Sequence, residues 1–178
     1  TPSLHCVATL RERFPHAVEV MVDACQFRIA PATLRAYLQS GFMVAVTGSK
    51  FVTGPSFSGA LFFPAAVARR LRDYPLPRAL HGYSARAEWP PAWTAAALLE
   101  PAANYGLLLR WEAALHEMRA LRAVPEVAVT SFLRDFGRAV EGRLKHDPAF
   151  AYLPTPRLDR RPLVNEGGWD YLTTLFPF

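Results

Sequence analysis

The chain of 178 residues is 51% hydrophobic and 20% charged, which excludes a disordered, collagen-like or coiled-coil protein. Its net charge of +5 comes from scattered residues, and the densest basic group, at positions 69–72, indicates a solvated helix face rather than a nucleic-acid patch. No apolar run approaches the ~18 residues of a membrane helix, and no secretory leader pattern opens the chain. We therefore expect a cytoplasmic protein with neither nucleic acid nor membrane as a partner.

Cysteine and histidine spacing excludes the common disulfide and metal frameworks. The chain has two cysteines, Cys6 and Cys25, without a CxxC spacing, and none of its five histidines belongs to an HExxH motif. We expect no metal site, and we expect Cys25 to pack beside a strand rather than to react.

In the first half of the chain, apolar runs alternate with helical spacing. Pro31 can open a helix because a first-turn N–H needs no partner, and Gly41 can end it. Apolar strands separated by a helix favour an α/β sheet with a crossover connection. The predicted elements are a helix over 4–14, a buried strand over 18–22, a helix over 31–41, a strand over 42–46, a strand over 57–63 and a helix over 64–73.

The second half begins with a long loop and continues as helices. Residues 74–92 contain four prolines and one glycine, so we expect a loop there. Apolar residues at helical spacing then predict a long helix over about 93–124 and a second one over 131–145. The last residues, from 148 onwards, are expected to be irregular. Because the chain begins at a helix and ends without a stop signal, we expect it to be a piece of a longer protein.

Lysine is used in an unusual way. Of the 20 lysines and arginines, only Lys50 and Lys145 are lysines. Lys145 lies in a charged helix end, whereas Lys50 directly follows the apolar run 42–46 and a Thr-Gly-Ser turn. Arginine stays charged, but lysine can lose its proton and become nucleophilic when it is desolvated. Lys50 is therefore a candidate nucleophile, with a snorkelling surface lysine as the alternative.

Other polar side chains follow the same two predicted strands. Asp23 and Gln26 come after the first strand, and Thr47 and Ser49 precede Lys50 after the second. Ligands of open α/β sheets bind at the carboxyl ends of the strands. An acid, an amide, two hydroxyls and an amine at one edge suit a cofactor with an aldehyde, a ring nitrogen and a phosphate.

The pattern of Asp23-Ala-Cys-Gln26, then Thr47-Gly-Ser-Lys-Phe51 and Gly54-Pro55, resembles the pyridoxal-phosphate enzymes of fold type I, particularly the class V aminotransferase group. The matching stretch covers about residues 18–64. The resemblance implies the C-terminal part of a large cofactor-binding domain, with a mixed, mostly parallel sheet and helices, over 1–92. An interdomain helix and part of a small α+β domain would occupy 93–178.

The resemblance also implies residue roles. Lys50 would hold pyridoxal 5'-phosphate as a Schiff base, and Asp23 would pair with the ring nitrogen. Gln26 would donate to the phenolic oxygen, and Thr47 would contact the phosphate. Ser49 stands where many relatives have a histidine. The alternatives from the residues alone are a loop cap for Asp23, a loop amide for Gln26, a turn hydroxyl for Thr47 and a structural role for Ser49.

Three further features are weaker candidates. Ser84 resembles a loop hydroxyl that reaches a neighbouring subunit's phosphate, although an ordinary loop serine is the favoured interpretation. Arg157, Arg160 and Arg161 could bind a substrate carboxylate, but a solvated basic loop is favoured. Residues 167–170 are expected to form a turn.

The leading hypothesis is a pyridoxal-phosphate-dependent aminotransferase that acts on an amino acid or small amine, with a small-molecule amino donor and acceptor. By resemblance the parent protein would be a homodimer. The phosphate loop, the ring-stacking residue and the usual substrate arginine would lie outside this chain, so the 178 residues alone should bind the cofactor poorly and be inactive. The alternatives are a pyridoxal-phosphate lyase or desulfurase, and a non-catalytic α/β scaffold.

Overall fold

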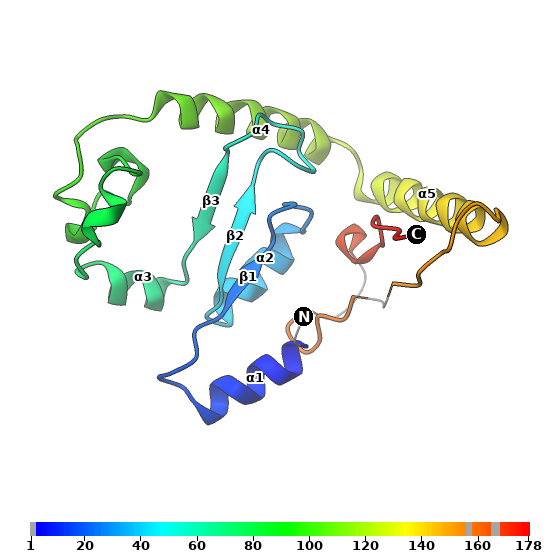
Figure 1. Ribbon diagram of the computed structural model, residues 1–178, viewed down its shortest axis with the longest axis horizontal. Coiled ribbons are helices and arrows are strands. Elements are labelled where there is room, and N and C mark those ends of the chain that lie inside the picture. Colours follow the sequence, from blue (N-terminus) through cyan, green and yellow to red (C-terminus); the bar gives the residue numbers. More distant parts are fainter. Residues whose placement is uncertain (1–2, 156–157, 165–167) are drawn as a thin grey trace. The chain divides into compact units, whose positions relative to one another are not determined.

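The computed structural model describes residues 3–155, 158–164 and 168–178, and its sheet has three short strands (Figure 1). These are β1 (Met21–Asp23), β2 (Met43–Thr47) and β3 (Gly59–Phe62), in the order β1-β2-β3. β1 runs parallel to β2, and β3 runs antiparallel to it. The predicted α/β class is confirmed, with a small mixed sheet.

Five α-helices accompany the strands in the part of the chain that the structure describes. Four 3₁₀ turns, at 78–80, 86–88, 94–96 and 169–171, punctuate the loops. The helices are α1 (Leu4–Arg13), α2 (Pro31–Gln39), α3 (Ala65–Leu71), α4 (Tyr105–Ala123) and α5 (Glu126–His146).

The helix α2 begins and ends where the sequence predicts. Pro31 is its first residue. At its end Gly41 adopts a φ of 78°, a left-handed conformation that costs glycine little. The N–H groups of Gly41 and Phe42 then donate to the carbonyl oxygens of Leu38 and Tyr37, both at 3.0 Å. These two bonds satisfy the last carbonyls of the helix, as in a Schellman motif.

Two helix boundaries differ from the prediction. The helix expected over 93–124 starts only at Tyr105, because Asn104 caps it: the Asn104 side-chain oxygen accepts the Leu107 N–H at 2.9 Å. The helix expected over 131–145 starts at Glu126, directly after Pro125, which suits the residue before a first turn. In both cases local capping, rather than apolar periodicity, sets the boundary.

The first strand is shorter and more exposed than predicted. The buried strand expected over 18–22 is β1, in which Met21 is 60% exposed and Asp23 is the last strand residue. β1 lies at the edge of the sheet and hydrogen-bonds only β2 among the described strands. An apolar, β-branched run alone does not distinguish an edge strand from a central one.

The chain divides into two compact units, while the predicted boundary between a cofactor-binding domain and a small domain after residue 92 stays a prediction. Unit 2 comprises 20–27 and 37–117, so the loop over 74–104 and the first part of α4 belong with the sheet. Unit 1 comprises 1–19, 28–36 and 118–178. Trp93, Ala96 and Leu99 are buried, and the Trp93 ring packs on Phe63 directly after β3, so this segment packs with the sheet.

In unit 2, the central strand supplies the core. Val44 and Val46 are 0% and 1% exposed, while the residues between and beside them are only half-buried. This alternation is that of a strand with one fully covered face. The ring of Trp93 packs against Phe63 and Trp89, with centroid distances of 5.4 and 5.7 Å.

In unit 1, a buried ion pair lies at the centre of the packing. Asp170 and Arg160 have side chains 1% and 6% exposed, and Nη1 of Arg160 lies 3.2 Å from Oδ2 of Asp170. The same carboxylate oxygen accepts the hydroxyl of Thr33 at 2.7 Å and the N–H of Ala30 at 2.9 Å. One aspartate thus holds together three segments that are distant in the sequence.

None of the helices in the part of the chain that the structure describes has both the length and the apolar content that a bilayer crossing requires.

Replacing Asp170 by alanine should destabilise unit 1 strongly. The variant leaves the buried Arg160 guanidinium without its counter-charge, and losing one partner of such a pair costs about 3–5 kcal/mol. The measurement is the free energy of unfolding from urea titration, followed by circular dichroism. The matched control is Asp159→Ala, which removes an exposed pair with Arg161 and should change stability little. Equal effects of the two variants would contradict this account.

Candidate functional site

The carboxyl ends of β1 and β2 lie side by side. The two strands are parallel, with Asp23 opposite Ala45, and the N–H of Ala24 continues the ladder to the Ala45 carbonyl at 2.9 Å. Parallel neighbours end at the same sheet edge, so the loops that follow β1 and β2 meet there. The predicted juxtaposition of the two strand-end segments is therefore present.

Hydrogen bonds join these two loops at two points. The Thr47 hydroxyl donates to the Cys25 carbonyl oxygen at 3.0 Å, and the Phe51 N–H donates to the Gln26 carbonyl oxygen at 3.2 Å. Because the single Thr47 proton is used on Cys25, the 3.1 Å contact between the Thr47 and Ser49 oxygens must be donated by Ser49. Both hydroxyls are thus engaged within the site.

Asp23 is exposed, and its carboxylate is held by its own loop. Oδ1 accepts the Cys25 N–H at 3.0 Å. Hydrogen bonds from the Cys25 thiol and then from the Cys25 N–H lower the pKa of Asp23, and the positive charge of Lys50 adds a smaller lowering. The carboxylate is therefore anionic at neutral pH. The same hydrogen bond to Asp23 raises the pKa of the Cys25 thiol, so Cys25 is a hydrogen-bond donor rather than a reactive thiolate.

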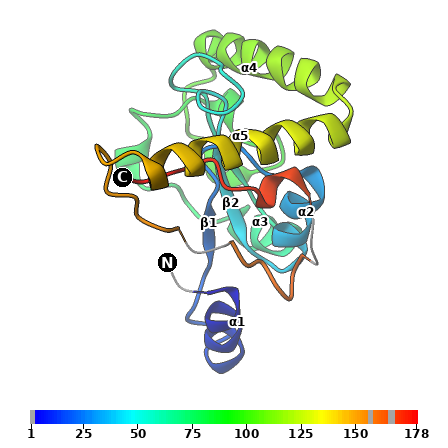
Figure 2. The ribbon, with the colours of Figure 1, turned by 90° about the vertical axis from the view of Figure 1, so that its right-hand side faces the viewer.

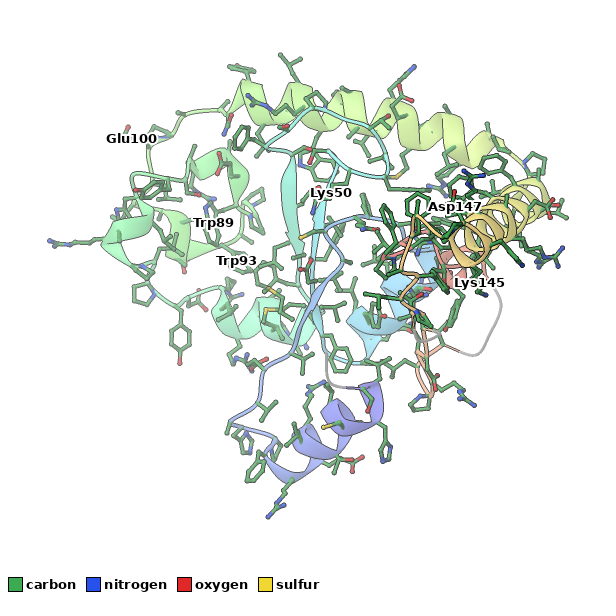
Figure 3. The ribbon with its side chains drawn as sticks, turned by 45° about the vertical axis from the view of Figure 1, so that its right-hand side comes forward. Lys50, Trp89, Trp93, Glu100, Lys145 and Asp147 are labelled. Carbon is green, nitrogen blue, oxygen red and sulfur yellow. The ribbon has the colours of Figure 1, made fainter. Side chains whose placement is uncertain are left out.

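Lys50 is exposed on a tight loop at the end of β2, as Figure 3 shows. The Gly54 N–H donates to the Gly48 carbonyl at 2.8 Å and closes the loop, while the Thr53 N–H donates to the Lys50 carbonyl at 3.0 Å. The Lys50 charge acts on both Asp23 and Cys25. The amine and the carboxylate thus belong to one electrostatic site.

Backbone strain gathers around these loops. Among the described residues, the non-glycine residues with positive φ are Phe27 (56°), Thr53 (52°) and Phe57 (63°). All three lie in the segments that follow β1 and β2. Such conformations are unfavourable for bulky or β-branched side chains and cluster at functional sites. These three positions could not be predicted from the sequence, because no residue type there signals a left-handed backbone.

Ser84 is placed in the long loop, with its hydroxyl engaged there. It accepts the Trp89 indole N–H at 2.6 Å and donates to a Glu88 carboxylate oxygen at 3.2 Å. Glu88 in turn accepts the Asn104 side-chain N–H at 2.6 Å. This network fixes the loop beside the start of α4. The predicted role of Ser84 toward a neighbouring subunit stays a prediction.

The three arginines of the basic segment differ in their surroundings. The favoured interpretation placed Arg160 in a solvated loop, and this is wrong. Arg160 is buried against Asp170, because that carboxylate compensates its charge. Arg161 is exposed and pairs with Asp159 at 2.8 Å, as a solvated residue would. Arg157 lies outside the described residues, as does part of the turn expected over 167–170. Its last residue, Asp170, belongs to a buried 3₁₀ turn.

The described cavity nearest the sheet does not contain the candidate residues. It has a volume of about 450 Å³ and lies beside β3, lined by residues 59–61, Glu88 and the first two turns of α4. Lys50 and Asp23 are not among its lining residues. Asp23 and Lys50 are both exposed, so these two side chains are open to solvent.

Comparisons with protein-family models, with curated proteins and with solved structures found no match. Among the described residues, no cluster of three or more histidine, cysteine, aspartate or glutamate side chains is arranged to hold a metal ion. The site must therefore be judged on its own geometry.

The pKa of Asp23 should lie below that of an ordinary aspartate, and substitutions of Cys25 should change it most. We expect Cys25→Ala to raise it, because the thiol hydrogen bond is its largest cause, and Cys25→Ser to keep it low. Since the folded pKa is depressed, the stabilisation is present above the unfolded pKa, near 3.8, and is lost as pH falls through the folded pKa. The measurement is an NMR titration of the Asp23 carboxyl carbon. A titration unchanged in Cys25→Ala would refute the assignment.

Proposed function

We propose that this chain carries the lysine-bearing part of the cofactor site of a pyridoxal-phosphate-dependent enzyme, an aminotransferase similar to the class V group of fold type I. The observation that carries the proposal is the placement of the Lys50 amine and the anionic Asp23 carboxylate on two hydrogen-bonded loops at one sheet edge. The resemblance of the same residues to the family motif is independent of that geometry.

The side chains at this sheet edge include the chemical groups that bind pyridoxal 5'-phosphate. Lys50 would attach covalently to its aldehyde, Asp23 would accept a hydrogen bond from the ring nitrogen, and Gln26 would bond the phenolic oxygen. Thr47 would face the phosphate. When bound, the ring supplies an electron sink for the bonds at the substrate's α-carbon. The low pKa of Asp23 suits its role, because a carboxylate that stays anionic keeps the ring nitrogen protonated.

The chain's own chemistry then centres on two groups. The Nζ atom of Lys50 would act as the base that takes up the substrate's α-proton and as the acid that returns it. Its position on a loop closed by the Gly54 to Gly48 hydrogen bond limits its movement. The Asp23 carboxylate, held by Cys25, provides fixed negative charge without changing its own protonation. The substrates would be an amino acid or small amine as donor and a keto acid as acceptor, handled by a homodimer of the parent protein.

Three rivals make different use of the same residues. A desulfurase needs a nucleophilic cysteine, and Cys25 is poorly suited because hydrogen bonding to Asp23 raises its pKa. A lyase without such a cysteine remains a rival that product analysis separates from an aminotransferase. A non-catalytic scaffold is favoured by one observation: the hydroxyls of Thr47 and Ser49 already satisfy each other and Cys25. Cofactor attachment distinguishes the scaffold from both enzymes.

Incubation with pyridoxal phosphate followed by borohydride should label Lys50. Peptide mass spectrometry of the intact protein should find the reduced phosphopyridoxyl group on Lys50 in large excess over Lys145. Lys145 is a built-in control, since it is about half exposed and pairs with Glu141 at 3.1 Å in the other unit. Equal labelling of the two lysines would support the scaffold instead.

Replacing Asp23 by asparagine should lower turnover by about a hundredfold or more while the fold is kept. The amide can still accept the Cys25 N–H but carries no charge to hold a proton on the ring nitrogen. The measurement is keto acid released from a panel of amino acids by the intact protein, with circular dichroism as the folding check. Asp73→Asn, which changes an exposed aspartate paired with Arg72 in the same unit, should leave the rate unchanged.

A further inference from the structure

One face of α4 lies against the loop that carries Lys50. Figures 1 and 2 both show the segment after β2 running beside this helix. The contacts come from Trp111 and Ala114, which are three residues apart and therefore share a helix face. Both belong to the same compact unit as the sheet. Ala114 is fully buried, and Trp111 is half-buried.

Ala114 fits against the base of the lysine loop without spare room. A Cβ atom added at Gly48 would lie 2.5 Å from the Ala114 Cβ, and one added at Gly54 would lie 2.6 Å from it. These are the two glycines whose backbones close the loop around Lys50. Close packing of this kind transmits a displacement instead of absorbing it. The position of Ala114 therefore sets where the loop can lie.

Trp111 connects the same helix face to the other strand-end loop. Its indole N–H donates to the Gly59 carbonyl at 3.2 Å, at the start of β3. Its ring meets the Phe27 ring edge-on, with the centroids 6.2 Å apart and the planes at 81°. Phe27 follows Gln26 directly and is one of the strained residues. One side chain thus contacts β3 and the loop that continues from Asp23.

We infer that Trp111 and Ala114 are positioning residues of the site: together they fix the Lys50 loop relative to the loop of Asp23. The effect on catalysis rests on the proposed function, whereas the effect on the loop positions rests on the contacts of Trp111 and Ala114. Neither residue touches the cofactor or the substrate in this proposal. A displacement near 1 Å at a reacting group can cost about a hundredfold in rate, so a change of one methyl group at this contact is large enough to matter.

The first test compares two identical substitutions on adjacent residues. Ala114→Val adds two carbons against Gly48 and Gly54, whereas Ala113→Val adds them on the exposed side of α4. With pyridoxal phosphate and borohydride as the probe, Ala114→Val should lower the ratio of Lys50 label to Lys145 label about tenfold. Ala113→Val should leave the ratio unchanged. Equal ratios in the two variants would overturn the inference.

A compensating pair of substitutions distinguishes a displaced loop from a variant that does not fold. Gly48→Ala should lower the label ratio, because the new methyl group meets that of Ala114. Adding Ala114→Gly should restore much of the ratio, since the space is returned and only a tight contact to Ser58 remains. A double variant no better than Gly48→Ala would refute the positioning role.

A measurement without cofactor separates this inference from the proposed function. Hydrogen exchange of the Gly48 and Gly54 amides, which donate to the Ser58 and Gly48 carbonyls, should be faster in Ala114→Val than in Ala113→Val. If wild-type Lys50 shows no preferential labelling but this exchange difference is present, the proposed function fails and the positioning of the loop stands. If labelling is preferential but unaffected in Ala114→Val, the positioning role fails alone.

Discussion

The candidate site depends on the parallel pairing of β1 with β2 and on the hydrogen bond from Thr47 to the Cys25 carbonyl. The pairing brings the two strand ends to one edge, and the side-chain bond then ties the loops beyond the point where the ladder stops. A second bond, from the Phe51 N–H to the Gln26 carbonyl, also joins these loops beyond the ladder. Two hydrogen bonds of ordinary strength thus decide whether an acid and an amine form a site.

Much of this arrangement could be predicted from the sequence because it follows from strong local signals. Pro31 and Gly41 fix the ends of the crossover helix, and the apolar run at 42–46 identifies the central strand. The polar residues after the strands then had to meet at one edge. The exposure of β1 could not be predicted, since Met21 and its apolar neighbours have the same composition in an edge strand as in a central one.

The parts that the sequence did not reveal depend on tertiary contacts. No local pattern connects Ala114 with Gly48 and Gly54, which are more than fifty residues away in the chain. The glycines on either side of Lys50 were a usable signal, because a loop that needs two small residues implies a close neighbour. Arg160 was also misjudged, since its partner Asp170 lies ten residues further on in what looked like an exposed turn. Burial of a charge depends on its partner and not on its own segment.

Asp170 and Asp23 show how burial distinguishes a structural carboxylate from one that can bind a ligand. Asp170 is surrounded by donors from Thr33, Ala30 and Arg160, and replacing any of them with a ligand would require opening the core of its unit. Asp23 is also anionic, but it is exposed, and its identified hydrogen-bond donors come from Cys25 alone. Part of its acceptor capacity therefore faces solvent on the same surface as the Lys50 amine. A carboxylate that is fixed in direction and still accessible can bind a protonated ring nitrogen, whereas one that is buried and closed to solvent, as Asp170 is, stabilises the fold.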